Sequence, residues 1–154
     1  MGAIGTWVAM RNILYSGDNI ALFTATTAVK AGQVVAYHGT GVSNAINKSV
    51  KASTVGAIGV ALYDAGVGVL VAVAMDGCVV YVANTDNATT IDAGDLLGTT
   101  TNAVGGYVDA CAMTTGGAVP VMVEKVGIAL EDIAASGYGR MMISCGYHTT
   151  ANDA

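Results

Sequence analysis

Charged residues are scarce in this chain of 154 residues. Asp, Glu, Lys and Arg together make up 11% of it, against about a quarter of an ordinary soluble domain. Six of them are basic, they are scattered along the sequence, and the net charge is −5. Proteins that bind nucleic acid gather Lys and Arg on the face that meets the phosphate backbone. The composition argues against that class, and we expect no direct contact with nucleic acid.

Side chains that transfer protons are also few. Histidine occurs only at His38 and His148, and Ser, Thr or Cys nucleophiles need a neighbouring base of this kind. His38 precedes a Gly-Thr-Gly turn, and His148 lies close to the C-terminus. No spacing pairs Glu124 with Glu131 as acid and base, and no phosphate-binding glycine loop is present. We expect no catalytic residues, no cofactor and no enzyme activity.

Cysteine occurs three times, at Cys78, Cys111 and Cys145, without a Cys-x-x-Cys pair. Each lies among apolar neighbours, and an odd number does not form a complete disulfide framework. Buried free thiols in a reducing compartment explain this pattern better than a zinc or redox site. The first residues also lack the basic segment and apolar run of a secretory signal. We therefore expect synthesis in the cytoplasm and no metal centre.

One apolar run is long enough to cross a membrane as a helix. It extends from Val55 to Met75 and contains a single charge, Asp64, near its middle. A carboxylate at that depth costs about 2.5 to 3.5 kcal/mol, and several glycines interrupt the run. Two strands joined by a turn that includes Asp64 and Gly66 explain the run better. We expect no membrane span.

Hydrophobic residues, by contrast, make up 53% of the chain, and the mean hydropathy is +0.58. This excludes an intrinsically disordered chain, which combines low hydrophobicity with high net charge. A single domain of this length buries a sizeable core. A surface with so little charge favours association for a free monomer. The composition therefore predicts that burial continues against copies of the chain or a larger partner.

Short apolar runs bounded by Gly, Asn, Asp, Ser or Thr fill most of the sequence, as is typical of β-strands. The runs Gly68 to Met75 and Cys78 to Ala83 flank Asp76-Gly77 and predict a hairpin. Both faces of these runs are apolar, which fits strands whose outer face is covered. We expect an all-β fold, a single compact β-barrel or β-sandwich of about ten short strands. Further strands are expected at Ile20 to Thr24, Gln33 to Tyr37, Ala57 to Tyr63, Asp95 to Gly98, Gly106 to Ala112, Val119 to Val123, Val126 to Leu130 and Arg140 to Cys145.

An internal repeat is the most informative feature. Gly59-Val60-Ala61-Leu62-Tyr63-Asp64 recurs as Gly127-Ile128-Ala129-Leu130-Glu131-Asp132, and an Ala-Gly strand start precedes each copy, at Ala31 to Val35 and at Ala93 to Leu97. The repeat predicts two similar β units around one core. Chance similarity in a chain rich in Gly, Ala and Val is the alternative. The residues expected to shape the turns of the units are Gly32, Gly59, Asp64, Gly77, Gly94, Gly127 and Asp132.

Aspartates fall into two groups along the chain. Asp64 and Asp132 each follow a strand, where a carboxylate that accepts backbone N–H bonds stabilises a turn. The densest acidic segment, with Asp86, Asp92 and Asp95, matches neither an EF-hand loop nor a β-roll repeat. Whether this segment binds a cation stays open at this point.

The segment before the first expected strand carries aromatic and aliphatic residues without a clear strand period. Apolar anchors of this kind are typical of docking segments, so the candidate interface residues are Trp7, Met10, Arg11 and Tyr15. An ordinary first strand that covers the barrel is the alternative. The expected organisation is an N-terminal arm at residues 1–16, a β-barrel or β-sandwich domain at 17–147 and a flexible tail at 148–154.

The order of these elements resembles the capsid cement, or decoration, proteins of tailed bacteriophages and related viruses. The resemblance extends from about Gly17 to Gly146 and depends on the number and order of short motifs rather than on any one of them. The motifs are Gly17-Asp18-x-Ile20, Ala31-Gly32-x-Val34-Val35, Gly59-Val60-Ala61-Leu62-x-Asp64, Asp76-Gly77-Cys78-Val79, Ala93-Gly94-Asp95 and Gly127-Ile128-Ala129-Leu130.

The resemblance implies a structural protein of the virion that binds the outer surface of the expanded icosahedral capsid. There it cements neighbouring subunits of the major capsid protein against the pressure of the packaged DNA. It also implies a homotrimer, with a dimer as the other option, made in the host cytoplasm, whose arm contacts the capsid or a neighbouring protomer. The alternatives are a carbohydrate-binding or host-attachment β module on the virion surface, which predicts clustered exposed aromatic residues, and a small membrane protein.

Overall fold

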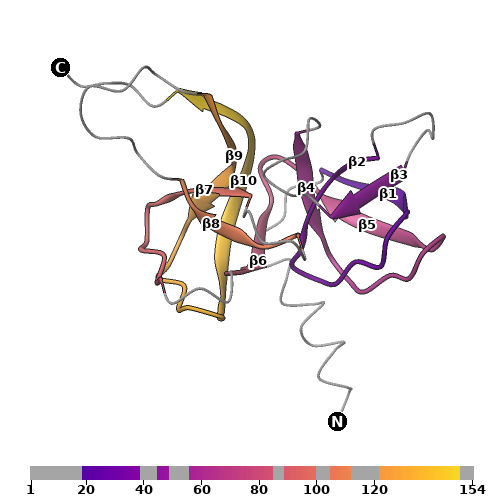
Figure 1. Cartoon of the computed structure of the whole chain (residues 1–154), viewed down its shortest axis with the longest axis horizontal. Helices are drawn as coiled ribbons and strands as arrows, with labels where there is room; N and C mark the ends of the chain where they lie inside the picture. Colours follow the sequence, from indigo (N-terminus) through magenta and orange to yellow (C-terminus); the bar gives the residue numbers. More distant parts are fainter. Residues whose placement is uncertain are drawn as a thin grey trace, which may run out of the picture.

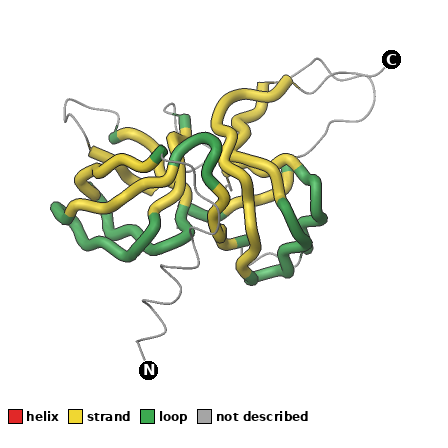
Figure 2. Tube along the Cα trace, turned by 180° about the vertical axis from the view of Figure 1, so that it is seen from behind, coloured by secondary structure: helices red, strands yellow, loops and turns green. Residues whose placement is uncertain are grey.

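The computed structural model describes residues 19–38, 45–48, 56–84, 89–99, 105–111 and 122–149. All regular secondary structure in these ranges is β-strand, without a helix (Figure 2). The predicted all-β fold of about ten short strands is confirmed. The strands are β1 (Ile20–Ala25), β2 (Val34–Tyr37), β3 (Ala45–Lys48), β4 (Ala57–Ala61), β5 (Leu70–Ala74), β6 (Val79–Ala83), β7 (Leu96–Thr99), β8 (Val108–Ala110), β9 (Met122–Ala129) and β10 (Tyr138–Thr149).

Strands β1 to β5 form a closed barrel, drawn on the right of Figure 1. In the order β1-β3-β2-β4-β5, neighbouring strands are antiparallel except β1 and β3, which run parallel. Because alternate side chains of a strand face opposite sides, Phe23, Val35, Ile46 and Val71 point inward and pack together, each at most 4% exposed. We call residues 20–74 unit 1.

Strands β6 to β10 form a second sheet, in the order β6-β10-β9-β7-β8. Its two edge strands approach each other, because Asn84, directly after β6, and Val108 in β8 form an isolated parallel bridge. This bridge corresponds to the parallel pairing of β1 and β3 in the closed barrel. The second sheet is therefore a barrel that a single bridge closes. We call residues 79–149 unit 2.

The two units repeat each other strand for strand, with β1 to β5 corresponding to β6 to β10. β4 lies between β2 and β5, as β9 lies between β7 and β10. An isolated antiparallel bridge joins Val29 to Ala65 in unit 1, and the same bridge joins Ile91 to Ile133 in unit 2. The prediction of two similar β units is thus confirmed by the pairing of their strands.

Unit 1 packs the outer face of its β2-β4-β5 strands against unit 2. Val34, Val60 and Ala74 form one row of cross-strand partners on this face, and with Leu62 they are at most 3% exposed. All four belong to the same apolar cluster as the interior of unit 2. The backbone N–H of Val34 also donates to the carbonyl of Gly106 in unit 2 at 2.8 Å. The two units therefore share a continuous core, as expected of a single compact body.

The predicted hairpin about Asp76-Gly77 is wrong. β5 pairs with β1 and β4, whereas β6 pairs with β10, so the strands on either side of the turn belong to different units. The turn connects the units, and the Asp76 carboxylate accepts a bond from the backbone N–H of Cys145 in β10 at 2.8 Å. An Asp-Gly pair specifies a tight turn, but the hydrogen-bonding partners of each strand come from its own unit.

Other strand boundaries also differ from expectation. β9 is one continuous strand from Met122 to Ala129, where two separate strands were expected. β3 at Ala45–Lys48 was not expected, because its sequence Ala-Ile-Asn-Lys is half polar and does not form an apolar run. β10 continues to Thr149, beyond the expected domain end at residue 147. The arm at residues 1–16 and the chain after Thr149 lie outside the described residues.

Candidate functional site

Two equivalent aspartates tie turns together at one end of each unit. The backbone N–H of Ala31 donates to Asp64 Oδ1 at 2.9 Å, and that of Ala93 donates to Asp132 Oδ1 at 2.9 Å. Each bond joins the turn before β2 or β7 to the turn after β4 or β9. The carboxylates thus accept backbone N–H bonds, as expected. The donors, however, lie in a turn that is distant in the sequence, and not in the turn that contains the aspartate.

The glycines expected in turns fall into two groups. Gly32, Gly77 and Gly94 lie in turns with φ of 84°, 90° and 94°, a conformation that favours glycine. Gly59 and Gly127 lie inside β4 and β9 instead. A Cβ at either position would lie within 3.0 Å of a carbonyl oxygen in the paired strand β5 or β10. Close approach of two strands, and not a turn, therefore requires these glycines.

The expected interface residues of the N-terminal arm lie outside the described residues: Trp7, Met10, Arg11 and Tyr15. Asp86 does as well. Asp92 and Asp95 close a turn, because Asp95 Oδ2 accepts the backbone N–H of Asp92 at 3.1 Å and the N–H of Asp95 donates to the carbonyl of Asp92 at 3.1 Å. In the described ranges, no group of three His, Cys, Asp or Glu side chains is placed to hold a metal ion.

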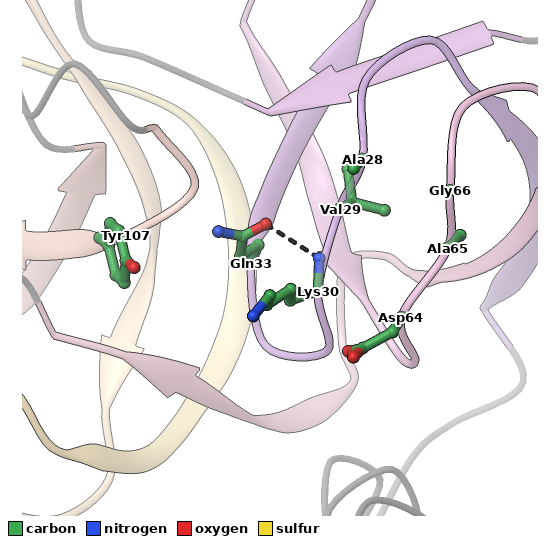
Figure 3. Close-up of a pocket in the computed structure, with 8 residues that line it drawn as sticks. All are labelled: Ala28, Val29, Lys30, Gln33, Asp64, Ala65, Gly66 and Tyr107. Carbon is green, nitrogen blue, oxygen red and sulfur yellow. Dashed lines mark hydrogen bonds between the residues drawn. The ribbon is translucent and has the colours of Figure 1, made fainter.

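A cavity of about 530 Å³ opens where the turns of unit 1 meet unit 2. Tyr107 of unit 2 lies on one side and Gly66 on the other, with Lys30 and Gln33 between them (Figure 3). Gln33 Oε1 accepts the backbone N–H of Lys30 at 2.9 Å, and the Asp64 carboxylate at the rim holds the neighbouring turn. The side-chain oxygens of Gln33 and Asp64 thus stabilise the walls of the cavity.

Glu124 links the two units through its carboxylate. Oε1 accepts the backbone N–H of Ala57 at the start of β4, and Oε2 accepts the hydroxyl of Thr99 in β7 at 3.1 Å. The sequence showed Glu124 only as a carboxylate without an acid–base partner. Nothing in its local pattern indicates a polar contact across the interface of the units.

The three cysteines are in the thiol form, buried at Cys78 and partly buried at Cys111 and Cys145. Cys145 Sγ lies 3.8 Å from the carbonyl of Val126. Burial, and next the negative charge of Asp76, raise the pKa of the Cys145 thiol to about 12. At neutral pH this thiol is protonated, which makes it a weak nucleophile.

A group of aliphatic side chains is exposed on the outside of β1 and β5 in unit 1. Leu22 and Leu70 are each 53% exposed, and Ile20 is 39% exposed. They lie on one face, because Leu22 pairs with Ala72 and Thr24 pairs with Leu70 in the β1–β5 ladder. We call Ile20, Leu22 and Leu70 the β1–β5 face. The sequence did not predict this face, because both faces of the run Gly68 to Met75 are apolar and the pattern does not show which one points outward.

A second apolar face lies on the outside of unit 2. Leu96, Ile128 and Met142 are cross-strand partners in one row of β7, β9 and β10, and Leu130 follows β9. Leu130 and Met142 are 42% and 37% exposed, and the other two are partly buried. We call these four residues the β7–β9–β10 face.

An ion pair lies on the same side of β10 as this second face. Arg140 Nη2 is 3.0 Å from Glu131 Oε2, and the backbone N–H of Arg140 donates to Glu131 Oε1 at 2.9 Å. The side-chain hydrogen bond from Arg140 lowers the pKa of Glu131 below its ordinary value. The two opposite charges compensate each other, so the face carries no unpaired charge from this pair.

No helix in the described part of the chain is long and apolar enough to cross a membrane. No protein-family model and no curated protein matches the sequence. Among solved structures, the chain is similar to the crystal structure of the N base of head fiber gp8.5 from bacteriophage phi29. The TM-score is 0.56 and the sequence identity 21%, over 81% of this chain and 92% of that one.

The likeness extends over both units. Either unit alone spans less than half of the 154 residues, whereas the match includes 81% of the chain. The similarity therefore concerns the arrangement of two β units in one body, beyond a single five-stranded barrel. At this identity it is a likeness of fold.

Proposed function

We propose that this chain is a structural protein of a bacteriophage head and binds the outer surface of the icosahedral shell. The observation that carries the proposal is the fold likeness to the phi29 head fiber base, which includes both units. The resemblance to capsid cement proteins supports it separately, because that resemblance depends on the order of sequence motifs rather than on the fold.

In this role the chain cements neighbouring subunits of the major capsid protein on the expanded shell. The surface chemistry supports such a role. Exposed Leu22, Leu70 and Leu130 and a charged fraction of 11% suit a protein that works against other subunits rather than alone in solution. The shared core of the two units gives a rigid body, which transmits load between the sites that it bridges.

We take the working form to be a homo-oligomer, a trimer in preference to a dimer, as the sequence resemblance implies. Several equivalent contacts on one symmetric shell raise the effective concentration of each further contact. Contacts that are individually weak then hold the assembly firmly. The chain is made in the host cytoplasm and resides on the outer capsid surface.

Adding purified chain to expanded shells that lack it, and imaging the shells by electron cryo-microscopy, tests the proposal. We expect ordered density at symmetry-related positions on the outer surface, and shells that withstand higher temperature before they release DNA. Unexpanded shells are the matched control and should bind less. Folded protein that leaves no ordered density on expanded shells would overturn the proposal.

A deletion of Met1 to Arg11 separates the two roles left open for the N-terminal arm. Loss of shell density with an unchanged oligomer mass assigns the arm to the capsid contact. A lower oligomer mass assigns it to the contact between protomers. A glycan-binding screen of the same protein tests the host-attachment alternative, which predicts binding to glycans and no ordered density on the shell.

A further inference from the structure

The cavity between the units contains an amide group that the turns around it do not use. Gln33 is 6% exposed, and its Oε1 accepts the backbone N–H of Lys30 at 2.9 Å. Because the oxygen of the amide faces that donor, Nε2 points the other way, toward Tyr107 across the cavity (Figure 3). Within the described residues, Nε2 has no hydrogen-bond partner. An NH2 group in so buried a side chain costs free energy without an acceptor, so it suits a partner from outside the chain.

Unit 2 closes its equivalent turn without an amide. Asp95 corresponds to Gln33 and Asp92 to Lys30, counted from the Ala-Gly pair of each repeat. The Asp95 carboxylate accepts the backbone N–H of Asp92 at 3.1 Å, as Gln33 Oε1 accepts that of Lys30. A carboxylate is therefore sufficient for this turn. Unit 1 has an amide and an ammonium group in place of two carboxylates, and the difference falls on the turn that lines the cavity.

The donors of the cavity lie on one side of it. Lys30 Nζ and Gln33 Nε2 both point toward Tyr107, whereas Asp64 lies on the far side of Lys30 from Tyr107 (Figure 3). Lys30 forms no ion pair with any residue that the structure describes. One positive charge with neutral donors beside it matches a carboxylate, a monoanion whose oxygens only accept hydrogen bonds. A phosphate dianion would meet a single cation and the Asp64 carboxylate nearby.

Unit 2 holds the Gln33 side chain in position. A Cβ at Gly106 would lie 2.9 Å from Gln33 Cβ and 3.0 Å from its Cδ, so the backbone of unit 2 packs directly on this side chain. The carbonyl of Gly106 also accepts the backbone N–H of Val34 at 2.8 Å. The Gln33 donor is therefore ordered before any ligand arrives, which lowers the entropy cost of binding.

We propose that the cavity binds the carboxylate of an acidic side chain on a protein segment that enters between the units. Lys30 Nζ and Gln33 Nε2 donate to the carboxylate, with the Tyr107 hydroxyl on the opposite side. The volume of about 530 Å³ lies in the usual range of ligand sites. The remaining wall has small residues that leave room for the main chain of the segment: Ala28, Ala65 and Gly66. The inference requires no capsid, so shell binding plays no part in its test.

The test titrates the isotope-labelled full chain and follows its amide signals by nuclear magnetic resonance. The probe is glutamate with an acetylated amino group and an amidated α-carboxyl group, so that the side-chain carboxylate is its only charge. We expect saturable shifts of the Gln33 side-chain NH2 signals and of the backbone signals of Lys30 and Tyr107. The same compound made from glutamine is the uncharged control and should shift none of them. Acetate, a carboxylate without a main chain, should bind more weakly than the probe.

Two substitutions test the donors one at a time. Gln33→Glu replaces Nε2 by a carboxylate oxygen and keeps the acceptor that closes the turn, as Asp95 does in unit 2. Lys30→Met removes the charge from an exposed side chain and keeps its aliphatic stem. Each should weaken binding of the probe by about tenfold or more, the size of a hydrogen bond to a charged group. Lys125→Met removes the same charge from β9, outside the cavity lining, and should bind as the wild type does.

The amide spectrum of each variant checks its fold, since a folded variant keeps the dispersed signals of the wild type. The inference is overturned by unshifted Gln33 signals at high probe concentration, or by folded Lys30→Met and Gln33→Glu variants that bind like the wild type. Acetate that binds as tightly as the probe contradicts a contact with the main chain of a protein segment. Glucuronate that binds more tightly than the probe assigns the cavity to an acidic sugar and overturns the inference as well.

Discussion

Leu62 and Leu130 occupy equivalent positions in the two β units, but Leu62 is 3% exposed and Leu130 is 42% exposed. The difference comes from the interface between the units, which covers the outer face of unit 1 and leaves that of unit 2 open. Side chains of the same chemistry and the same local geometry therefore contribute differently to stability. Burial of apolar area, and not residue type, decides the contribution.

This contrast gives a stability prediction, to be measured at a protein concentration low enough to keep the chain monomeric. Leu62→Ala should lower the free energy of unfolding by about 2 to 5 kcal/mol, because it removes packed methyl groups and leaves a cavity. Leu130→Ala should lower it by less than about 1 kcal/mol. Urea unfolding followed by circular dichroism measures both. Equal losses would contradict the burial of Leu62 at the interface.

The glycines inside β4 and β9 give a second prediction. In Gly59→Ala and in Gly127→Ala, the new methyl group meets the carbonyl oxygen of Ala74 or Met142 in the neighbouring strand. The backbone cannot yield without breaking the ladder, so we expect each variant to lose about 1 to 3 kcal/mol, as overpacked sites do.

Gly66→Ala is the matched control for these variants. The nearest atom to a Cβ at Gly66 is Val69 Cγ2 at 3.9 Å, which is an ordinary contact. Its stability should change by no more than about 1 kcal/mol, with a gain possible from the lower entropy of the unfolded chain. Thermal unfolding compares the three proteins. A Gly66→Ala variant as unstable as Gly59→Ala would assign the effect to the loss of glycine in general.

The two turn aspartates give a third prediction. Asp64→Ala and Asp132→Ala each remove one acceptor of a backbone N–H bond, from Ala31 and Ala93. Both bonds are exposed to water, so each loss should be about 1 kcal/mol. Because the bonds lie in separate units and share no partner, the losses should add in the double variant. Hydrogen exchange of the Ala31 and Ala93 amides checks that the effect is local.

The sequence predicts the repeat and the strand content but not how the units face each other. The Ala-Gly and Gly-x-Ala-Leu-x-Asp motifs lie within single strands and turns, so their period is local and readable. The interface depends on Val34, Val60 and Leu62, whose outward position needs the register of three strands. A run with two apolar faces gives no sign of which face is inside. The pairing of whole strands was likewise out of reach. Asp76-Gly77 predicted a hairpin, but the strands on its two sides pair within different units, so the turn is a link between the units.

The Glu131–Arg140 pair gives a prediction about pH. The pKa of Glu131 in the folded protein lies below the ordinary value of 4.5, so folding favours the ionised carboxylate. The pair's contribution is complete above pH 4.5 and is lost as the pH falls through the lower folded pKa. Because the two side chains are 34% and 35% exposed, solvent screening limits the contribution to less than about 1 kcal/mol.

A double-mutant cycle with Glu131→Gln and Arg140→Gln measures this contribution. The coupling energy at neutral pH should shrink in high salt and vanish in acid below the folded pKa of Glu131. A coupling that is the same at both pH values would show that the ionic part of the contact adds nothing.

The Cys145 thiol gives the last prediction, which concerns reactivity. Only the thiolate attacks alkylating reagents, and a pKa of about 12 leaves almost none of it at neutral pH. Native protein should therefore label at Cys145 at least tenfold more slowly than the urea-unfolded chain, as measured by mass spectrometry after iodoacetamide treatment. Asp76→Asn removes the largest charge contribution to the pKa and should speed the reaction only modestly, because burial is the first cause of the shift. Rapid native labelling at Cys145 would contradict its burial between β9 and the Asp76 turn, and with it the anchoring of β10 to the link between the units.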